Sequence, residues 1–283
     1  MPDCQDATGL EAEPPGQTTM TTESKREAAA VGASDGAQVP EHLLTIAIPN
    51  YNYGRYIEHA LQSIREQDHP DIEVIVVDDG SEDDSVERVE GALAGMDGLY
   101  RAELIRFEEN RGKLAALNAA VEQARGRYFI ILDADDWLTP NYASRCIAEL
   151  CRRREENPKI GFIYSDCNLM DDEGNYINRG RSTPFDRELV GRLSFLPEPA
   201  LTLTRAIREA GPFDERIRKA TKHHKWVRIV ARGWYGHYIN EPLFYYRMHG
   251  DNMSGIGERI TSETDKGSYG ERILSGYWQV SGD

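Results

Sequence analysis

The sequence predicts an α/β protein with a mostly parallel sheet that is covered by helices on both faces. Short runs such as 72–77 and 128–132 are almost wholly apolar, which is typical of strands buried on both sides. Helical patterns separate these runs: Ile57, Leu61 and Ile64, for example, share one face of a helix. This alternation of strand and helix indicates a Rossmann-like, nucleotide-binding half.

The expected elements follow one another along the chain. Strands are predicted at 43–48, 72–77, 102–107, 128–132 and 161–165. Helices are predicted around Ile57 and at 85–93, 114–123, 143–154 and 221–232. The Gly- and Arg-rich stretch 175–183 is expected to be a loop. Residues 1–40 hold almost no large apolar side chain, so this segment cannot offset its ordering entropy and is expected to be a disordered tail.

Composition argues against several classes of function. The 283 residues are 40% hydrophobic and 29% charged, which suits one large core or one core plus a small lobe. A net charge of −15 argues against nucleic acid and anionic membranes as partners, since both attract clustered Lys and Arg. We expect a cytoplasmic location without an integral membrane segment, because no apolar run is long enough to span a bilayer and the N-terminus lacks a secretion-signal pattern. The four cysteines show neither metal-ligand nor disulfide spacing.

Three carboxylates follow the apolar run 128–132, namely Asp133, Asp135 and Asp136. A buried strand tolerates unpaired acids only where it leaves the sheet, and open α/β sheets bind ligands at the carboxyl ends of their strands. Clustered carboxylate oxygens suit a hard divalent cation such as Mg²⁺ or Mn²⁺. Acids after strands also cap helices and fill turns, so the triplet alone leaves both interpretations open.

Two other strand ends carry side chains that suit a nucleotide. Pro49 is expected to end the first strand, so that Tyr51 projects toward a nucleobase and Asn52 bonds the base or ribose. A capping loop with a packed tyrosine is the alternative. Asp78 and Asp79 follow the second strand, where they either contact the ligand or cap the next helix.

Two cations, Arg111 and Lys113, stand just before a helix whose N-terminus attracts anions. On an acidic protein they would supply the local positive charge that a nucleotide needs. A solvated basic pair is the alternative interpretation.

Four motifs, in this order and spacing, resemble those of the family 2 glycosyltransferases. They are Ile-Ala-Ile-Pro-Asn-Tyr-Asn at 46–52, Val-Val-Asp-Asp-Gly-Ser at 76–81, Asn-Arg-Gly-Lys at 110–113 and Asp-Ala-Asp-Asp at 133–136. The resemblance implies a GT-A fold, in which a nucleotide-sugar-binding half (41–138) is joined to an acceptor-binding half (139–254), with 255–283 left as a C-terminal tail. Members of the family transfer a sugar from a nucleotide diphosphate donor, which implies a role in polysaccharide or glycoconjugate biosynthesis.

The resemblance also implies roles for individual residues. Asp78 would accept a hydrogen bond from uracil or ribose, Asp135 would bind the metal directly, and Asp133 would contact ribose or reach the metal through water. The segment 246–254 is similar to a family loop, Tyr-Arg-x-His-x-x-Asn-x-Ser, that closes over the diphosphate. That similarity implies that His249 contacts metal or phosphate.

One segment departs from the family's pattern. After the turn 211–215, the family's helix opens with an acidic pair whose Asp deprotonates the acceptor hydroxyl, but here that position is Lys222. A protonated lysine cannot take a proton unless burial strongly lowers its pKa. His223 and His224 titrate near neutral pH and are the available substitutes. Either one of them is the base, or the chemistry is lost.

These observations favour a metal-dependent glycosyltransferase that uses Mn²⁺ or Mg²⁺, with a UDP-sugar as the favoured donor, an unknown hydroxyl as acceptor, and inversion expected from the family. The alternative is a GT-A-like protein that binds a nucleotide or a partner without transferring sugar, which Lys222 favours. A nucleotidyltransferase would need a Gly-rich, basic loop after the first strand, and 49–52 is not one.

Overall fold

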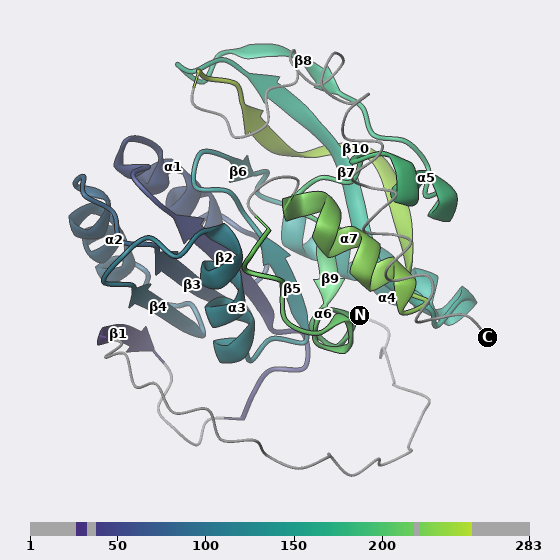
Figure 1. Ribbon diagram of the computed structural model, residues 1–283, viewed down its shortest axis with the longest axis horizontal. Helices are drawn as coiled ribbons and strands as arrows, with labels where there is room; N and C mark the ends of the chain where they lie inside the picture. The colour runs from purple at the N-terminus through teal and green to yellow at the C-terminus, as the bar shows by residue number, and fades with distance from the viewer. Residues whose placement is uncertain (1–26, 33–37, 218–220, 251–283) are drawn as a thin grey trace.

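The computed structural model describes residues 27–32, 38–217 and 221–250 (Figure 1). Its strands are β1 (Glu27–Gly32), β2 (Leu44–Asn50), β3 (Ile72–Asp78), β4 (Arg101–Arg106), β5 (Tyr128–Ile131), β6 (Trp137–Leu138), β7 (Ile160–Met170), β8 (Tyr176–Gly180), β9 (Leu201–Leu203) and β10 (Tyr235–Arg247). Its helices are α1 (Gly54–Arg65), α2 (Ser85–Ala94), α3 (Lys113–Gln123), α4 (Tyr142–Glu156), α5 (Arg187–Arg192), α6 (Thr204–Ala210) and α7 (Thr221–Ala231). Every predicted strand and helix is present at its expected place in the chain.

One ten-stranded sheet joins the strands in the order β1, β4, β3, β2, β5, β9, β7, β10 and β6, with β8 paired to β7. The neighbours from β4 to β5 are parallel, as are β7 and β10, whereas β1, β6, β8 and β9 pair antiparallel. The sheet is therefore mixed and mostly parallel, as the sequence predicts. Because β2, β3 and β5 run in the same direction, their carboxyl ends meet at one edge.

Helices cover both faces of this sheet. α1 and α2 pack together on one face, and Gln67, just after α1, accepts a hydrogen bond from the first turn of α4. On the other face α3 packs against α6, α6 against α7, and α7 against α5 (Figure 1). Among the helices that the structure describes, none is both long and apolar enough to cross a bilayer.

The apolar core explains why the central elements form. β3 buries all seven of its residues, as expected for a strand between two parallel neighbours. On α1, the predicted inner face of Ile57, Leu61 and Ile64 is fully buried. Burying each such side chain contributes roughly 1.5–3 kcal/mol. The loops at the carboxyl edge of the sheet are thus supported by a well-packed apolar core.

Two segments differ from their predictions. Residues 27–32, placed in a tail by composition, form β1 along the edge strand β4, because backbone pairing in an antiparallel ladder needs no large side chain. The predicted loop 175–183 contains β8, which returns along β7. A Cβ on Gly180 would come within 2.5 Å of Sγ of Cys167, so this glycine permits close strand pairing instead of marking a loop. The rest of the predicted N-terminal tail up to 37, and the C-terminal tail 255–283, lie outside the described residues.

Five further elements were not predicted. β6, β9, α5 and α6 are two to seven residues long, which is too short for a hydrophobic period to stand out in the sequence. The fifth, β10, is 13 residues long, but most of its residues are only partly buried or exposed, so it lacks the apolar run of the central strands.

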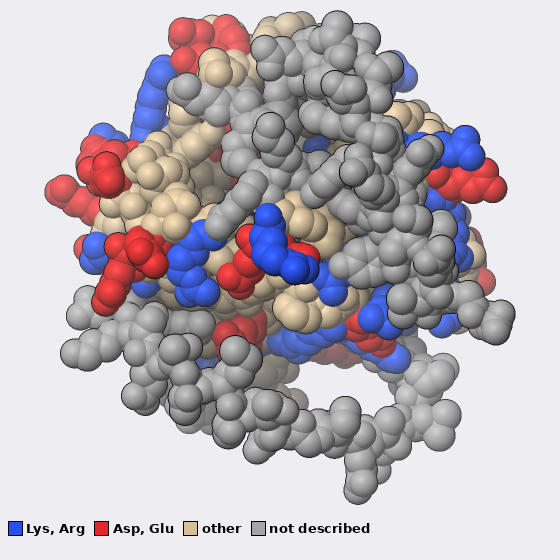
Figure 2. All heavy atoms as spheres, viewed as in Figure 1, with Lys and Arg blue, Asp and Glu red and all other residues tan. Residues whose placement is uncertain are grey.

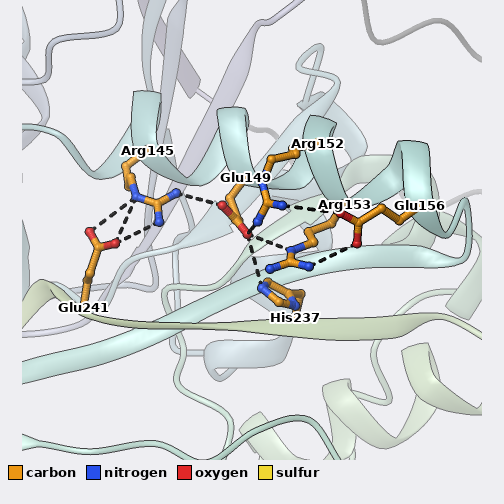
Figure 3. Close-up of polar contacts among 7 residues, drawn as sticks. All are labelled: Arg145, Glu149, Arg152, Arg153, Glu156, His237 and Glu241. Atoms are coloured by element: carbon orange, nitrogen blue, oxygen red, sulfur yellow. Dashed lines mark hydrogen bonds and ion pairs between the residues drawn. The ribbon is translucent and has the colours of Figure 1, made fainter.

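An ion-pair network joins α4 to β10 (Figure 3). Its centre is Glu149, which accepts hydrogen bonds from three arginines of the same helix, Arg145, Arg152 and Arg153. Across the interface, Nε2 of His237 lies 3.3 Å from Glu149, and Arg145 pairs with Glu241 at 2.8 Å. Burial alone would raise the pKa of Glu149, but the three guanidinium groups lower it to about 2. The network therefore fixes α4 to β10 through charges that persist at neutral pH.

Candidate active site

The end of β5 brings three acids into one cluster. Asp133, Asp135 and Asp136 each place a carboxylate oxygen within 4.8 Å of the other two. Asp136 is buried and accepts a hydrogen bond from the backbone N–H of Arg247 at 3.0 Å. Burial, together with Asp135 and Asp133, raises the pKa of Asp136 well above its usual value. A divalent cation would offset the repulsion among these carboxylates, so the cluster suits one.

His249 reaches this cluster from a distant part of the chain. Its Nε2 lies 2.9 Å from Oδ2 of Asp135, and its side chain is only 2% exposed. The imidazole stacks on the ring of Tyr56, with 4.9 Å between centroids, and meets Tyr53 edge-on at 5.9 Å. The two side chains predicted to bind metal are thus side by side, and the ring is packed in one orientation. Of the family-like loop 246–254, the last four residues lie outside the described residues.

Arg247 connects the two halves of the chain around the cluster. Its guanidinium donates to the backbone carbonyl of Asp135 at 3.1 Å and to that of Asp172 at 2.7 Å. Asp172 lies in the turn between β7 and β8, and its carboxylate accepts a hydrogen bond from the Tyr56 hydroxyl at 2.6 Å. Sequence reasoning missed Tyr56 and Asp172, because only the folded chain places that turn beside α1.

Lys113 lies between two carboxylates. Its Nζ is 2.6 Å from Oδ1 of Asp133 and 3.0 Å from Oε1 of Glu198. The other carboxylate oxygen of Glu198 is 2.6 Å from Nζ of Lys225, on α7. Burial alone would lower the pKa of Lys113, but Asp133 and Glu198 raise it, so the ammonium group stays charged. The predicted basic residue therefore does lie at the acid cluster.

Glu198 is a site residue that the sequence did not reveal. It lies in the loop before β9, and only 6% of it is exposed. Burial would raise its pKa, but Lys113 and Lys225, with a further contribution from Lys222, hold the pKa well below its usual range. Lys222 occupies the position at which the resemblance places the base. The carboxylate of Glu198 therefore interacts electrostatically both with that position and with Lys113 beside the acid cluster. A single glutamate between two prolines gave no recognisable signal.

Asp78 is buried at the end of β3 and already accepts three hydrogen bonds. The donors are Nδ2 of Asn50 at 2.9 Å, and the backbone N–H and hydroxyl of Ser81 at 3.0 and 2.6 Å. Within the described part of the chain, Oδ1 of the buried Asn50 accepts no hydrogen bond. A buried acceptor left in that state costs about 1–3 kcal/mol. The pair therefore suits a ligand that brings an N–H or O–H donor.

The first strand does not end at Pro49, contrary to the prediction. β2 continues through it to Asn50. Proline is tolerated here because β5 pairs with β2 only as far as Ala47, so the missing N–H removes no hydrogen bond from that ladder.

Tyr51 and Asn52 follow β2 and differ in their surroundings. Tyr51 is 40% exposed, so its ring is accessible to a base. Asn52 has a left-handed φ of 57°, and its amide oxygen accepts from the backbone N–H of Glu82 at 2.8 Å. Asn52 thus connects this loop to the one after β3.

Asp79 holds the loop that leads into α3 and caps neither α2 nor α3. Its carboxylate accepts from the backbone N–H groups of Arg111 at 2.7 Å and Gly112 at 2.8 Å, directly before α3. Burial nonetheless raises the pKa of Asp79. The Arg111 guanidinium lies over the ring of Phe107, 4.6 Å from its centroid, and 3.7 Å from Glu215. Arg111 therefore also forms an ion pair with Glu215, in the turn before α7.

The structure does not bring His223 and His224 to the acid cluster. Both side chains are buried on α7. Nε2 of His223 lies 2.7 Å from the carbonyl oxygen of Val190, and Nε2 of His224 accepts from the backbone N–H of Asp214 at 3.4 Å. Burial lowers the pKa of both, that of His224 to about 4. Their predicted role as the base conflicts with this placement, because each ring is buried against backbone away from the three acids.

Charge on the visible face is finely mixed. Figure 2 shows the acidic and basic side chains of the described residues interspersed on it. The part of this face that the described residues form is therefore not a broad basic surface.

Sequence comparison identifies relatives with related chemistry. The sequence model described as Glycosyl transferase family 2 matches residues 45–200. Chondroitin synthase of Escherichia coli is 30% identical over 215 residues, which make up 75% of this chain and 30% of that protein. The chain thus spans less than a third of that relative's length.

Two solved structures share the fold. TarS 1–349 of S. aureus, in complex with UDP-GlcNAc, has a TM-score of 0.60 at 19% identity. The match covers 83% of this chain and 71% of the TarS chain. The mannosyltransferase PcManGT from Pyrobaculum calidifontis, in complex with GDP-Man and Mn²⁺, has a TM-score of 0.58 at 19% identity, with coverage of 87% and 76%. These similarities confirm the predicted GT-A-like α/β fold.

Proposed function

Because this chain belongs to glycosyl transferase family 2, we propose that it transfers a sugar from a UDP-sugar to an acceptor hydroxyl, assisted by Mn²⁺ or Mg²⁺. The observation that carries the proposal is the contact between His249 and Asp135 inside a cluster of three acids at the carboxyl edge of the sheet. Buried acids and an imidazole so arranged have little structural purpose without a cation.

The cation would be held by Asp135 and His249, with Asp133 reaching it directly or through water. Carboxylate and imidazole donors fit Mn²⁺, and the carboxylates also fit Mg²⁺. When bound, the cation stabilises the negative charge of the departing nucleotide diphosphate. Lys113 and Arg247 add fixed positive charge around the same acids. The Mn²⁺ bound by PcManGT supports this part of the proposal.

The nucleotide would lie against the ends of β2 and β3. Tyr51 offers an accessible ring for the base. Oδ1 of Asn50, which accepts no hydrogen bond from any residue that the structure describes, offers an acceptor beside Asp78. Uracil carries an N–H donor on its pairing edge, as does guanine, so the contact alone does not choose between them. The UDP-GlcNAc bound by TarS, together with the family expectation, supports uridine.

The transfer itself would be a single displacement. The acceptor oxygen attacks the anomeric carbon from the side opposite to the departing diphosphate, which inverts the configuration at that carbon. Positioning of the two reactants, more than covalent participation of the protein, would then supply much of the rate.

A second function, nucleotide binding without transfer, is favoured by one observation. Lys222 replaces the family's acid, and His223 and His224 are buried against backbone. On this alternative, the residues that bind the nucleotide are all present, but no residue accepts the proton of the acceptor hydroxyl.

Calorimetry with UDP and GDP, each with and without Mn²⁺, tests donor binding. UDP should bind, and Mn²⁺ should tighten the binding; a ligand present at a hundred times its dissociation constant should also stabilise the fold by about 2.7 kcal/mol. Failure of both nucleotides to bind would contradict the proposal. NMR of UDP-sugar turnover then separates the two functions, because a binding protein without transfer releases no sugar, and an inverting enzyme first forms the opposite anomer.

A further inference from the structure

Transfer to a hydroxyl releases a proton, and the acceptor for that proton has to stand near both the donor and the acceptor. Lys222 is a poor candidate because a lysine is normally protonated, and the two histidines beside it are engaged with backbone. A carboxylate on the acceptor side of the acid cluster would meet the requirement.

Glu198 has that location. A single ammonium group, Nζ of Lys113, separates its Oε1 from Oδ1 of Asp133, at 3.0 and 2.6 Å. Its Oε2 meets Lys225, one turn into α7, at 2.6 Å. Glu198 therefore lies between the donor-side acids and the helix at which the family carries its base.

We propose that Glu198 is the catalytic residue that takes the proton from the acceptor hydroxyl. The proposal rests on the proposed transfer function. In the step, the acceptor O–H bond breaks as its oxygen forms a bond to the anomeric carbon. The bond from that carbon to the diphosphate oxygen breaks and its electron pair leaves with the nucleotide. The proton ends on a carboxylate oxygen of Glu198.

Two properties of Glu198 fit this role. Lys113 and Lys225 keep it ionised, and therefore able to accept, at any pH near neutrality. Two ionised oxygens offer about four acceptor positions, and the two lysine contacts account for two of them. A carboxylate so stabilised is a weak base, but a weak base suffices when the transition state resembles an oxocarbenium ion. The attacking hydroxyl becomes strongly acidic as its bond to carbon forms.

The test compares two nucleophiles that differ in whether they carry a proton. UDP-GlcNAc turnover is measured with water and with azide as acceptors, with Mn²⁺ present, for the parent, Glu198→Gln and the charge-balanced double variant Glu198→Gln/Lys225→Met. Glu209→Gln, which alters a glutamate paired with Arg205 on α6, is the matched control. UDP and Mn²⁺ affinity is measured by calorimetry for each variant, to establish that its donor site is intact.

In Glu198→Gln and in the double variant, turnover with water should fall by roughly a hundredfold, the usual value of a general base. Turnover with azide should stay close to that of the parent, because azide brings no proton to remove. The water rate should not depend on pH around neutrality in the parent.

Three results would overturn the proposal. Equal losses with water and azide would make Glu198 a positioning residue for Lys113. Recovery of the water rate in the double variant would assign the defect to unbalanced charge. A parent that binds UDP and Mn²⁺ but transfers the sugar of UDP-GlcNAc to neither nucleophile would refute Glu198 as a base that activates water, whereas a parent that binds neither UDP nor GDP would contradict the proposed function itself.

Discussion

Nε2 of His249 lies 2.9 Å from Oδ2 of Asp135, although the two residues are 114 positions apart in the chain. The contact forms where the end of β10 passes the loop after β5. Arg247 reinforces it, since its backbone N–H and its guanidinium both bond that loop. The proposed metal-binding pair therefore depends on the packing of β10 near the loop after β5, and not on either motif alone.

Replacing Asp135 by Ala should remove the Mn²⁺-dependent part of UDP affinity and leave the fold intact. Asp135 lies just after β5, and its side chain contacts His249. Calorimetry of UDP binding, with and without Mn²⁺, measures the effect. The exposed Asp97 provides a matched Asp→Ala control, which should bind UDP and Mn²⁺ like the parent. Unchanged metal dependence in Asp135→Ala would refute the assignment.

Tyr56 should matter for metal binding through its ring more than through its hydroxyl. The ring stacks on His249, whereas the hydroxyl bonds Asp172. Tyr56→Leu removes the stacked ring and should weaken Mn²⁺ binding about tenfold, the equivalent of roughly 1.4 kcal/mol and within the range for aromatic pairs. Tyr56→Phe keeps the ring and should weaken it less. Manganese titration followed by electron paramagnetic resonance decides, and equal effects of the two changes would contradict this role of the ring.

Asp78→Ala should weaken the binding of UMP as well as that of UDP, because the proposed partner of Asp78 is the base or the ribose, which both nucleotides carry. The change also removes the carboxylate that orients Asn50 and Ser81. Asp79→Ala is the matched neighbour: it removes the acceptor of two backbone hydrogen bonds in the loop before α3 and should lower the free energy of unfolding by about 1–3 kcal/mol. Paired UMP and UDP titrations of both variants provide the measurement. A loss confined to UDP would place Asp78 with the metal group instead.

Most of the fold and the position of the acid cluster followed from the sequence because their signals are local. Asp133, Asp135 and Asp136 stand at the end of one apolar run, and the strands alternate with helices at readable periods. Glu198 and the contact between Tyr56 and Asp172 gave no such signal, since each depends on segments distant in sequence.

The burial of His223 and His224 on α7 is also readable from the sequence. His223 stands three residues before Trp226 and four before Val227, so all three belong to one buried face of α7. The helical period therefore predicts that His223 packs inside the protein. The periodicity that predicted the helix also contained this answer.

The network around Glu149 should make stability depend on pH in a defined direction. Its pKa is lowered to about 2 in the folded protein, so its contribution is fully present above its ordinary value of 4.5 and is lost as the pH falls toward 2. At pH 7, Glu149→Gln should lower the free energy of unfolding by about 1–3 kcal/mol, the usual range for a charged hydrogen-bond partner. Urea unfolding at pH 7 and pH 3 should show a smaller difference from the parent at the lower pH. Glu156→Gln is the matched control, because Glu156 pairs with Arg152 and Arg153 but is 56% exposed, and it should change stability by less than about 0.5 kcal/mol. If the effect of Glu149→Gln were as large at pH 3 as at pH 7, the stabilisation would come from packing and not from the carboxylate's charge.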